Sequence, residues 1–512
     1  MRTIEAVHDP ALDKLVDAVR TARPHLIDEW ETTAVIESLG YTDVRIRREF
    51  GFSDTAALGV YVFDLMSART AERIETRRPH EPHALLQLID SVGASLVYAL
   101  PWLVTFLLER VRPDALRLPA GAGPPLSLSL MLSLIVSGGF IQAIARRGQF
   151  YIGMKQPGLA ALTCGYLMRL GALVSLGVAV AGLAVGWYFS LFTWPYLVLW
   201  ADQFLILCAL WLTCGVLTIR DEHWRVPVAF AVGGLAFLAV RATGHDALAA
   251  QLIGSAAVLA AAGIQVPRVF AHAGIEAPPT VVPPPRMTVL MYRALPFFWY
   301  GTLYFCFLFA DRFAASASVA ALTGAPFGMR PQYKLGMDLA LLTFLFASAG
   351  VEFANVRFTG LVTRAMRQPF TAGGGEFARR LQRIHLTVLG LAFAVFVPTA
   401  ALIGTAARRL LPGQSPIVWT MMAVGDVGYL LLAIGLVNGL ALVTLNRPWS
   451  TVKALTAALG VNIMVGYVLS HMFSPYFAVA GLIAGGFVFA LRSTVLARDA
   501  MRSGDHAISS PS

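Results

Sequence analysis

The sequence predicts an all-α polytopic membrane protein with about 12 transmembrane helices in two six-helix lobes, preceded by a small N-terminal helical cytosolic domain. Three observations support this fold class. The 512 residues are 57% hydrophobic and only 14% charged, whereas soluble domains are about 45–50% apolar and about 25% charged. Long apolar spans recur after residue 90, and a proline-rich segment divides them into two equal sets. This composition excludes an ordinary soluble multidomain enzyme, and a count of only four cysteines excludes a disulfide scaffold.

Residues 1–90 are predicted to form a separate domain, because their charge differs from that of the rest of the chain. Their net formal charge is −5, and that of residues 91–512 is +15. A first helix is predicted from apolar residues at helical spacing, Leu12, Leu15, Val16 and Val19. A second helix is expected over about 25–38, ending at Gly40, and a third after the N-cap candidate Asp54. We interpret this domain as a cytosolic docking or stability module.

Twelve hydrophobic spans follow, and most of them reach the roughly 20 apolar residues that a membrane-crossing helix needs. They are expected near 91–110, 125–145, 163–187, 195–217, 226–241, 247–266, 293–313, 337–356, 384–406, 416–443, 450–471 and 475–496.

A linker separates the sixth span from the seventh. The segment 276–286 contains five prolines, which remove hydrogen bonds from a helix interior, so it is interpreted as a semi-rigid extended tether. The predicted organisation is a first lobe over 91–270, a Pro-rich cytosolic linker over 271–290, a second lobe over 291–497 and a disordered tail over 498–512.

The distribution of basic residues predicts the orientation. With the N-terminal domain in the cytosol, the inner segments after residue 90 carry 20 Lys and Arg and the outer segments carry 9. Because cytosolic loops are enriched in these residues, both termini are expected in the cytosol.

The two halves echo each other in sequence. The first and seventh spans share an Ala-Leu-Pro-aromatic motif and end in an acid–arginine pair. The fourth and tenth spans each carry one acid after a small residue, Asp202 and Asp426. These matches suggest a parallel six-plus-six repeat, an arrangement of transporters.

Ionisable groups inside the spans are the candidate site residues. An unpaired charge within the bilayer costs about 2.5–3.5 kcal/mol on insertion scales, so such groups normally face a cavity or a partner. The candidates are Asp202, Asp311, Arg312, Glu352 and Asp426. A substrate pathway lined by these groups is one interpretation. Structural pairing is the alternative, especially for Asp311, which adjoins Arg312 at the expected outer end of the seventh span.

Aromatic residues crowd the seventh span. Tyr300, Tyr304, Phe307 and Asp311 share one helical stripe by their spacing. Aromatic rings beside an acid could contact sugar rings, which offer apolar CH faces and hydroxyl edges. The alternative is that these rings contact lipid at the membrane interface. Gly-x-x-x-Gly spacings and scattered cysteines within the spans are interpreted as helix packing.

The sequence resembles the multidrug/oligosaccharidyl-lipid/polysaccharide exporter superfamily and, within it, the membrane exporter subunits of Pel exopolysaccharide systems. Two segments carry the likeness to that branch, 196–204 with the Trp200-Ala-Asp202 motif and 300–313 with the Asp311-Arg312 pair. Gln203 stands where a basic residue is expected, and the N-terminal extension is additional. The resemblance implies an inner-membrane exporter or flippase that moves a polysaccharide or lipid-linked saccharide outward by alternating access. It also implies a cytosolic glycosyltransferase and other export-complex subunits as partners.

Other functions remain open at this point. A cation-coupled drug or small-molecule antiporter of the same superfamily would use the acids as proton or sodium sites. A membrane-embedded glycosyltransferase would need a catalytic acid or base in a sizeable outer loop, and the largest expected loop, about 313–336, is short. A non-transporting scaffold or sensor would use the N-terminal domain as its working part. The sequence contains no P-loop, no HExxH and no G-x-S-x-G motif, and its basic loops beside apolar spans are not a nucleic-acid signature. We therefore expect no enzyme activity and no cofactor.

Overall fold

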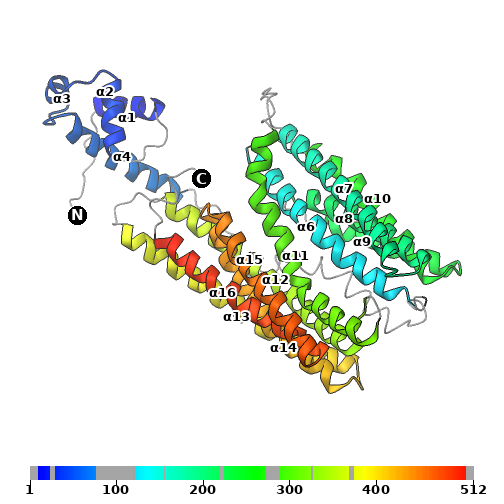
Figure 1. Ribbon diagram of the computed structural model, residues 1–512. Helices are drawn as coiled ribbons and strands as arrows, with labels where there is room; N and C mark the ends of the chain where they lie inside the picture. The colour runs from blue at the N-terminus through cyan, green and yellow to red at the C-terminus, as the bar shows by residue number, and fades with distance from the viewer. Residues whose placement is uncertain are drawn as a thin grey trace. The chain divides into compact units, whose positions relative to one another are not determined.

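The computed structural model describes residues 10–22, 29–76, 119, 121–154, 156–219, 224–271, 287–324, 327–367 and 374–502. All regular elements within these ranges are helices, and the chain divides into an N-terminal unit with α1–α4 and a membrane unit with α6–α16 (Figure 1).

The N-terminal unit contains four helices around a small apolar core. They are α1 (Pro10–Ala22), α2 (Glu29–Ser38), α3 (Asp43–Glu49) and α4 (Thr55–Thr76). The core contains the four residues that predicted the first helix, Leu12, Leu15, Val16 and Val19. Each of the other three helices adds one or two residues: Ile36, Ile46, Leu58 and Val62. The three predicted helices are confirmed. The short helix α3, which contributes Ile46, was not predicted.

The predicted helix boundaries in this unit have local causes. Gly40 adopts a φ of +83° just after α2, a backbone conformation that glycine adopts without a Cβ penalty. Asp54 accepts a hydrogen bond from the Ala57 amide at 2.8 Å, which confirms it as an N-terminal capping residue for α4.

The membrane unit consists of long helices in two sets. The first set is α6 (Gly123–Gly153), α7 (Pro157–Tyr188), α8 (Trp194–Leu217), α9 (Arg225–Ala242) and α10 (Ala247–Ala271). The second set is α11 (Met287–Thr323), α12 (Pro331–Arg367), α13 (Gly374–Leu410), α14 (Pro416–Thr444), α15 (Pro448–Met472), the 3₁₀ turn η2 (Pro475–Ala478) and α16 (Val479–Arg502).

Ten helices in the described part of the chain are long and apolar enough to cross a membrane. They correspond to ten of the twelve predicted spans. The predicted span 337–356 lies within α12, a helix that is not among these ten. The predicted span 91–110 lies outside the described residues, as does the proline segment 276–286.

Helix contacts in the two sets follow the same pattern. In the first set α8 contacts α6, α7 and α10, and α10 contacts α9. In the second set α14 contacts α13 and α16, and α16 contacts α15. Helix α12 packs on α14, where Gly336 adjoins Val418 and Met421. The contacts named for the first set therefore recur between the helices six spans later, in agreement with the predicted repeat.

The predicted end of the seventh span was wrong. The Asp311-Arg312 pair predicts a membrane boundary at residue 313, but α11 continues to Thr323. The pair is buried against neighbouring helices and does not end the helix. The outer loop expected over 313–336 is correspondingly shorter, because α12 begins at Pro331.

Glycines let the membrane helices approach closely, as the Gly-x-x-x-Gly spacings predicted. A Cβ at Gly182 would collide with the Trp200 ring, one at Gly435 with Phe489, and one at Gly481 with the Asn462 carbonyl. A close contact at glycine also joins the two sets, because a Cβ at Gly301 of α11 would collide with the Gly138 carbonyl of α6.

Candidate functional site

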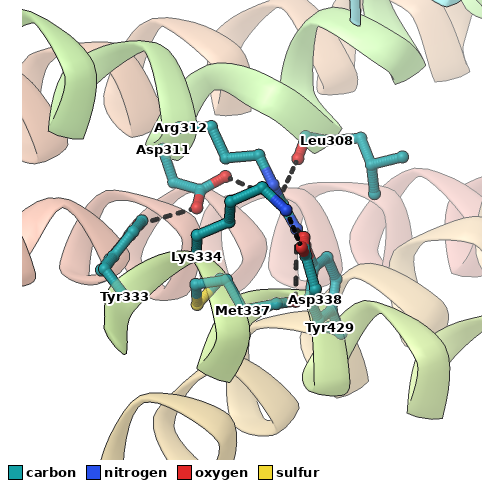
Figure 2. A network of polar contacts seen from close by, with 8 residues as sticks. All are labelled: Leu308, Asp311, Arg312, Tyr333, Lys334, Met337, Asp338 and Tyr429. Atoms are coloured by element: carbon teal, nitrogen blue, oxygen red, sulfur yellow. Dashed lines mark hydrogen bonds and ion pairs between the residues drawn. The ribbon is translucent and has the colours of Figure 1, made fainter. Parts of the chain in front are cut away.

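The centre of the candidate site is the guanidinium of Arg312, which is 2% exposed. It lies on α11 and reaches both α12 and α14 (Figure 2). Its Nη1 donates to the Tyr429 hydroxyl at 2.9 Å, and its Nη2 donates to the Met337 carbonyl at 3.2 Å. A planar guanidinium carries five donors in a fixed geometry, so one side chain can bridge three helices in this way.

Two carboxylates compensate the charge of Arg312. Asp311 Oδ1 lies 3.5 Å and Asp338 Oδ1 lies 3.4 Å from its guanidinium nitrogens. The Tyr333 hydroxyl donates to the other Asp311 oxygen at 2.8 Å, and Lys334 pairs with Asp338 at 2.9 Å (Figure 2). The two acids and two bases balance, so the cluster carries no net charge.

This network fixes the relative positions of α11, α12 and α14. Asp311 is fully buried, and removing one partner from a buried ion pair leaves an uncompensated charge. The ion pairing that the sequence allowed as an alternative is therefore present. In this conformation neither Asp311 nor Arg312 is accessible to a solute.

Asp426 differs from Asp311 because its charge has no cationic partner among the described ion pairs. It lies on α14, one turn before Tyr429, with a half-buried side chain beside Thr343. Its Oδ1 is buried and has no hydrogen-bond partner in the described structure. A carboxylate in this state can accept a hydrogen bond from a hydroxyl, an amine or a hydrated cation.

Asp202 and Glu352 complete the set of predicted acids. Asp202 was expected to be buried within its span, but its side chain is exposed on α8, because the neighbouring Gln203 occupies the buried face. Glu352 lies on α12, and its side chain lies outside the described part. Within the described residues, no three His, Cys, Asp or Glu side chains gather in a group that could hold a metal.

The predicted aromatic stripe on α11 lies largely within protein. Phe307 is fully buried, and the half-buried Tyr300 and Tyr304 pack against the core of the second set of helices. The stripe and Asp311 thus face the same core, as the spacing predicted.

Tyr333 and Tyr429 were not predicted to belong to the site. Tyr429 follows Asp426 by one helical turn, a spacing that could have been used. No spacing in the sequence links Tyr333 to the site, because it contacts Asp311 only through the packing of α12 on α11.

A second buried polar cluster, also not predicted, joins α13, α14 and α16. His385 Nε2 lies 2.9 Å from Asn438 Oδ1. The amide nitrogen of Asn438 donates to Ser493 at 3.1 Å and to Thr494 at 2.8 Å. A buried polar network with these partners stabilises a single packing of the three helices.

Solved structures of MATE transporters share this fold. A MATE transporter in complex with MaD5 superposes with a TM-score of 0.56 at 12% identity, covering 82% of this chain and 95% of that chain. An outward-facing multidrug resistance MATE family transporter of the MOP superfamily gives 0.54 at 12% identity, over 83% and 99%. An inward-facing structure with the same description gives 0.50 at 13% identity, over 83% and 99%. No protein-family model and no curated protein matches the sequence.

The fold is therefore that of membrane transporters, and in particular of MATE family transporters of the MOP superfamily. The membrane unit therefore has the fold that the sequence resemblance implies.

Proposed function

We propose that this protein is an inner-membrane exporter that moves a polysaccharide or lipid-linked saccharide out of the cytoplasm by alternating access. The observation that supports transport is the likeness of its helices to one transporter fold in both outward-facing and inward-facing forms, over 83% of the chain in each case. Two sets of helices with matching contacts are what a rocking mechanism requires.

Within this proposal the predicted residues take two roles. Asp202, which is exposed, and Asp426, which has an unpaired oxygen, contact the substrate on its path. Tyr300 and Tyr304 offer half-buried ring faces beside the network, and Glu352 lies on the same path. Asp311 and Arg312 hold α11, α12 and α14 together as one moving body.

The saccharide substrate is supported by the chemistry of these groups and by the sequence resemblance to Pel exporters. Carboxylates accept hydrogen bonds from sugar hydroxyls, and phenols both donate to them and accept from them. A partly deacetylated amino-sugar polymer is cationic, and acids along the path lower its electrostatic barrier.

The test is secretion of the polymer by cells that produce the double variant Asp202→Asn/Asp426→Asn at the same protein level as wild type. We expect secretion to fall by about tenfold or more, because both carboxylates contact the substrate in this proposal. Each substitution removes a negative charge and keeps the shape of the side chain. Asp246→Asn is the matched control, since Asp246 is an exposed acid that caps α10 through the Ala249 amide and Asn preserves that cap. Unchanged secretion in the double variant would remove both acids from the mechanism.

A cation-coupled antiporter of drugs or other small molecules is the second candidate. It is favoured by the multidrug resistance function named for the similar transporters. Uptake of a cationic dye into proteoliposomes, driven by a proton or sodium gradient and lost in Asp426→Asn, would support this candidate over saccharide export.

The N-terminal unit is proposed to dock a cytosolic glycosyltransferase or another export-complex subunit. This proposal includes a cytosolic location for both termini. Deletion of residues 1–85 tests it, because the truncated chain should remain in the membrane but lose secretion. If the truncated chain secretes normally, the unit has no role in export.

A further inference from the structure

Three arginines gather where the two sets of helices meet. Helices α6 and α11 run antiparallel along a close seam, from Gly138 beside Gly301 to Arg147 beside Arg293. The Arg147 guanidinium donates to the Arg293 carbonyl, and Arg146 lies over the Phe297 ring at 5.6 Å.

The cluster contains three arginines, and two of them have no anionic partner within the described ranges. Arg146 and Arg293 are exposed, and Arg147 is half-buried. Neither Arg147 nor Arg293 takes part in an ion pair between described residues. The Nε of Arg147 is buried and has no hydrogen-bond partner within the described ranges. The charges of Arg147 and Arg293 repel each other, and an anion that binds both would reduce this repulsion.

The position along the helices indicates the membrane surface. Arg147 follows Gly138 by nine residues, which is about 13 Å of helix. Half of the hydrocarbon core is about 15 Å thick. If the glycine contact lies near the middle of the bilayer, the guanidinium groups lie at the level of the lipid headgroups.

Apolar side chains surround the same place. Phe150 is 45% exposed and contacts Arg147 through its ring, at 5.9 Å from the guanidinium carbon. Tyr292 is 71% exposed beside Arg293. Phe297, whose ring lies under Arg146, is four residues nearer to the glycine contact than Arg293 and so lies on the bilayer side of the cluster. A soluble anion would gain nothing from Phe297, whereas the acyl chains of a lipid would cover it.

We propose that Arg146, Arg147 and Arg293 bind the phosphate of an anionic phospholipid at the α6–α11 seam. Its headgroup contacts the guanidinium groups and is bordered by Phe150 and Tyr292, and its acyl chains extend from there toward the bilayer centre along the Phe297 side of the seam. Because α6 and α11 belong to different halves of the repeat, one lipid then links the two halves at this end.

The test is lipid retention by the full chain, purified from nanodiscs and measured by native mass spectrometry. The probes are phosphatidylglycerol, which is anionic, and phosphatidylcholine, which is zwitterionic. Wild type should retain phosphatidylglycerol in preference to phosphatidylcholine. Arg147→Gln/Arg293→Gln should weaken that retention by about thirtyfold, and the exposed single change Arg293→Gln by about fivefold.

The control is Arg408→Gln/Arg409→Gln, which removes two exposed arginines at the far end of α13, one of them over Trp419. This control should retain phosphatidylglycerol as wild type does. Equal retention of both lipids by wild type, or undiminished retention by Arg293→Gln, overturns the proposal. Inorganic phosphate that protects the wild type from thermal unfolding as well as phosphatidylglycerol does would also overturn it, because the site would then bind a soluble anion.

Discussion

The guanidinium of Arg312 on α11 donates to the hydroxyl of Tyr429 on α14 at 2.9 Å, joining two helices that are 117 residues apart in the sequence. The same guanidinium reaches the Met337 carbonyl on α12 at 3.2 Å. One buried side chain therefore connects three helices of the second set.

Replacing Arg312 should destabilise the membrane unit. In Arg312→Met the buried Asp311 carboxylate loses its cation, and such losses cost about 3–5 kcal/mol. The free energy of unfolding in mixed micelles measures this, with the exposed Arg409→Met as control. If the two variants are equally stable, the network does not hold the helices together. Adding Asp311→Asn to Arg312→Met should recover part of the loss, because the unpaired charge is gone.

The hydroxyl of Tyr333 should contribute more than its burial alone. Tyr333→Phe keeps the ring and removes the 2.8 Å bond to Asp311, so the free energy of unfolding should fall by about 1.5–3 kcal/mol, the range for a hydrogen bond to a charged group. The neighbouring Tyr476→Phe is the matched control, because its bond to Gln332 is longer, at 3.4 Å, and only partly buried. A loss in Tyr333→Phe no larger than that in Tyr476→Phe contradicts the assigned role.

The N-terminal unit should lose stability in acid through Asp43. The Thr55 hydroxyl and amide donate to its carboxylate at 2.6 and 2.8 Å, and these bonds lower the pKa of Asp43 below its ordinary value of 3.8. A carboxyl whose pKa is lowered on folding stabilises the fold above its unfolded pKa, and that stabilisation is lost as the pH falls through the folded pKa. The Thr55 amide should therefore stay protected from hydrogen exchange at pH 5 and lose that protection only below pH 3.8, as the pH falls through the lowered pKa of Asp43.

Asp43→Asn should remove this acid dependence, whereas Asp64→Asn, at an exposed position of α4, should retain it. The measurement is the exchange protection of the full chain, corrected for the intrinsic effect of pH. An acid transition that persists in Asp43→Asn would assign it to another group.

The contact between α6 and α11 should not tolerate a methyl group. In Gly301→Ala the new Cβ would collide with the Gly138 carbonyl, and such overpacking costs about 1–3 kcal/mol. Gly165→Ala on α7 meets open space and should be neutral or slightly stabilising. Equal free energies of unfolding for the two variants would mean that α6 and α11 pack less closely than the contact between Gly301 and Gly138 implies.

The positions of the membrane helices could be predicted from the sequence, because each apolar span must be long enough to cross the bilayer. Their ends were predicted less well where a charge lay inside a helix. The pair Asp311-Arg312 predicts a membrane boundary, but partners on α12 and α14 satisfy its charges within the protein. Such partners come from tertiary packing, which no local pattern records.

The candidate site could be predicted in part. The sequence identified Asp426, whose oxygen is unpaired, because an acid inside an apolar span is unusual. The burial of each acid could not be predicted, since Asp202 and Asp426 occupy corresponding spans yet only Asp202 is exposed. In each case the neighbouring helix decides which face of the span is covered.

Alternating access is the central claim, and distances between spin labels on the two sets of helices test it most directly. One pair of labels at Tyr188 and Leu410 reports on the ends of α7 and α13, and a second pair at Met154 and Asn446 reports on the opposite ends; all four positions are exposed. The four native cysteines are first replaced by serine or alanine. The account predicts two populations in which one distance shortens as the other lengthens. A single unchanged distance for both pairs, with substrate present and absent, would contradict it.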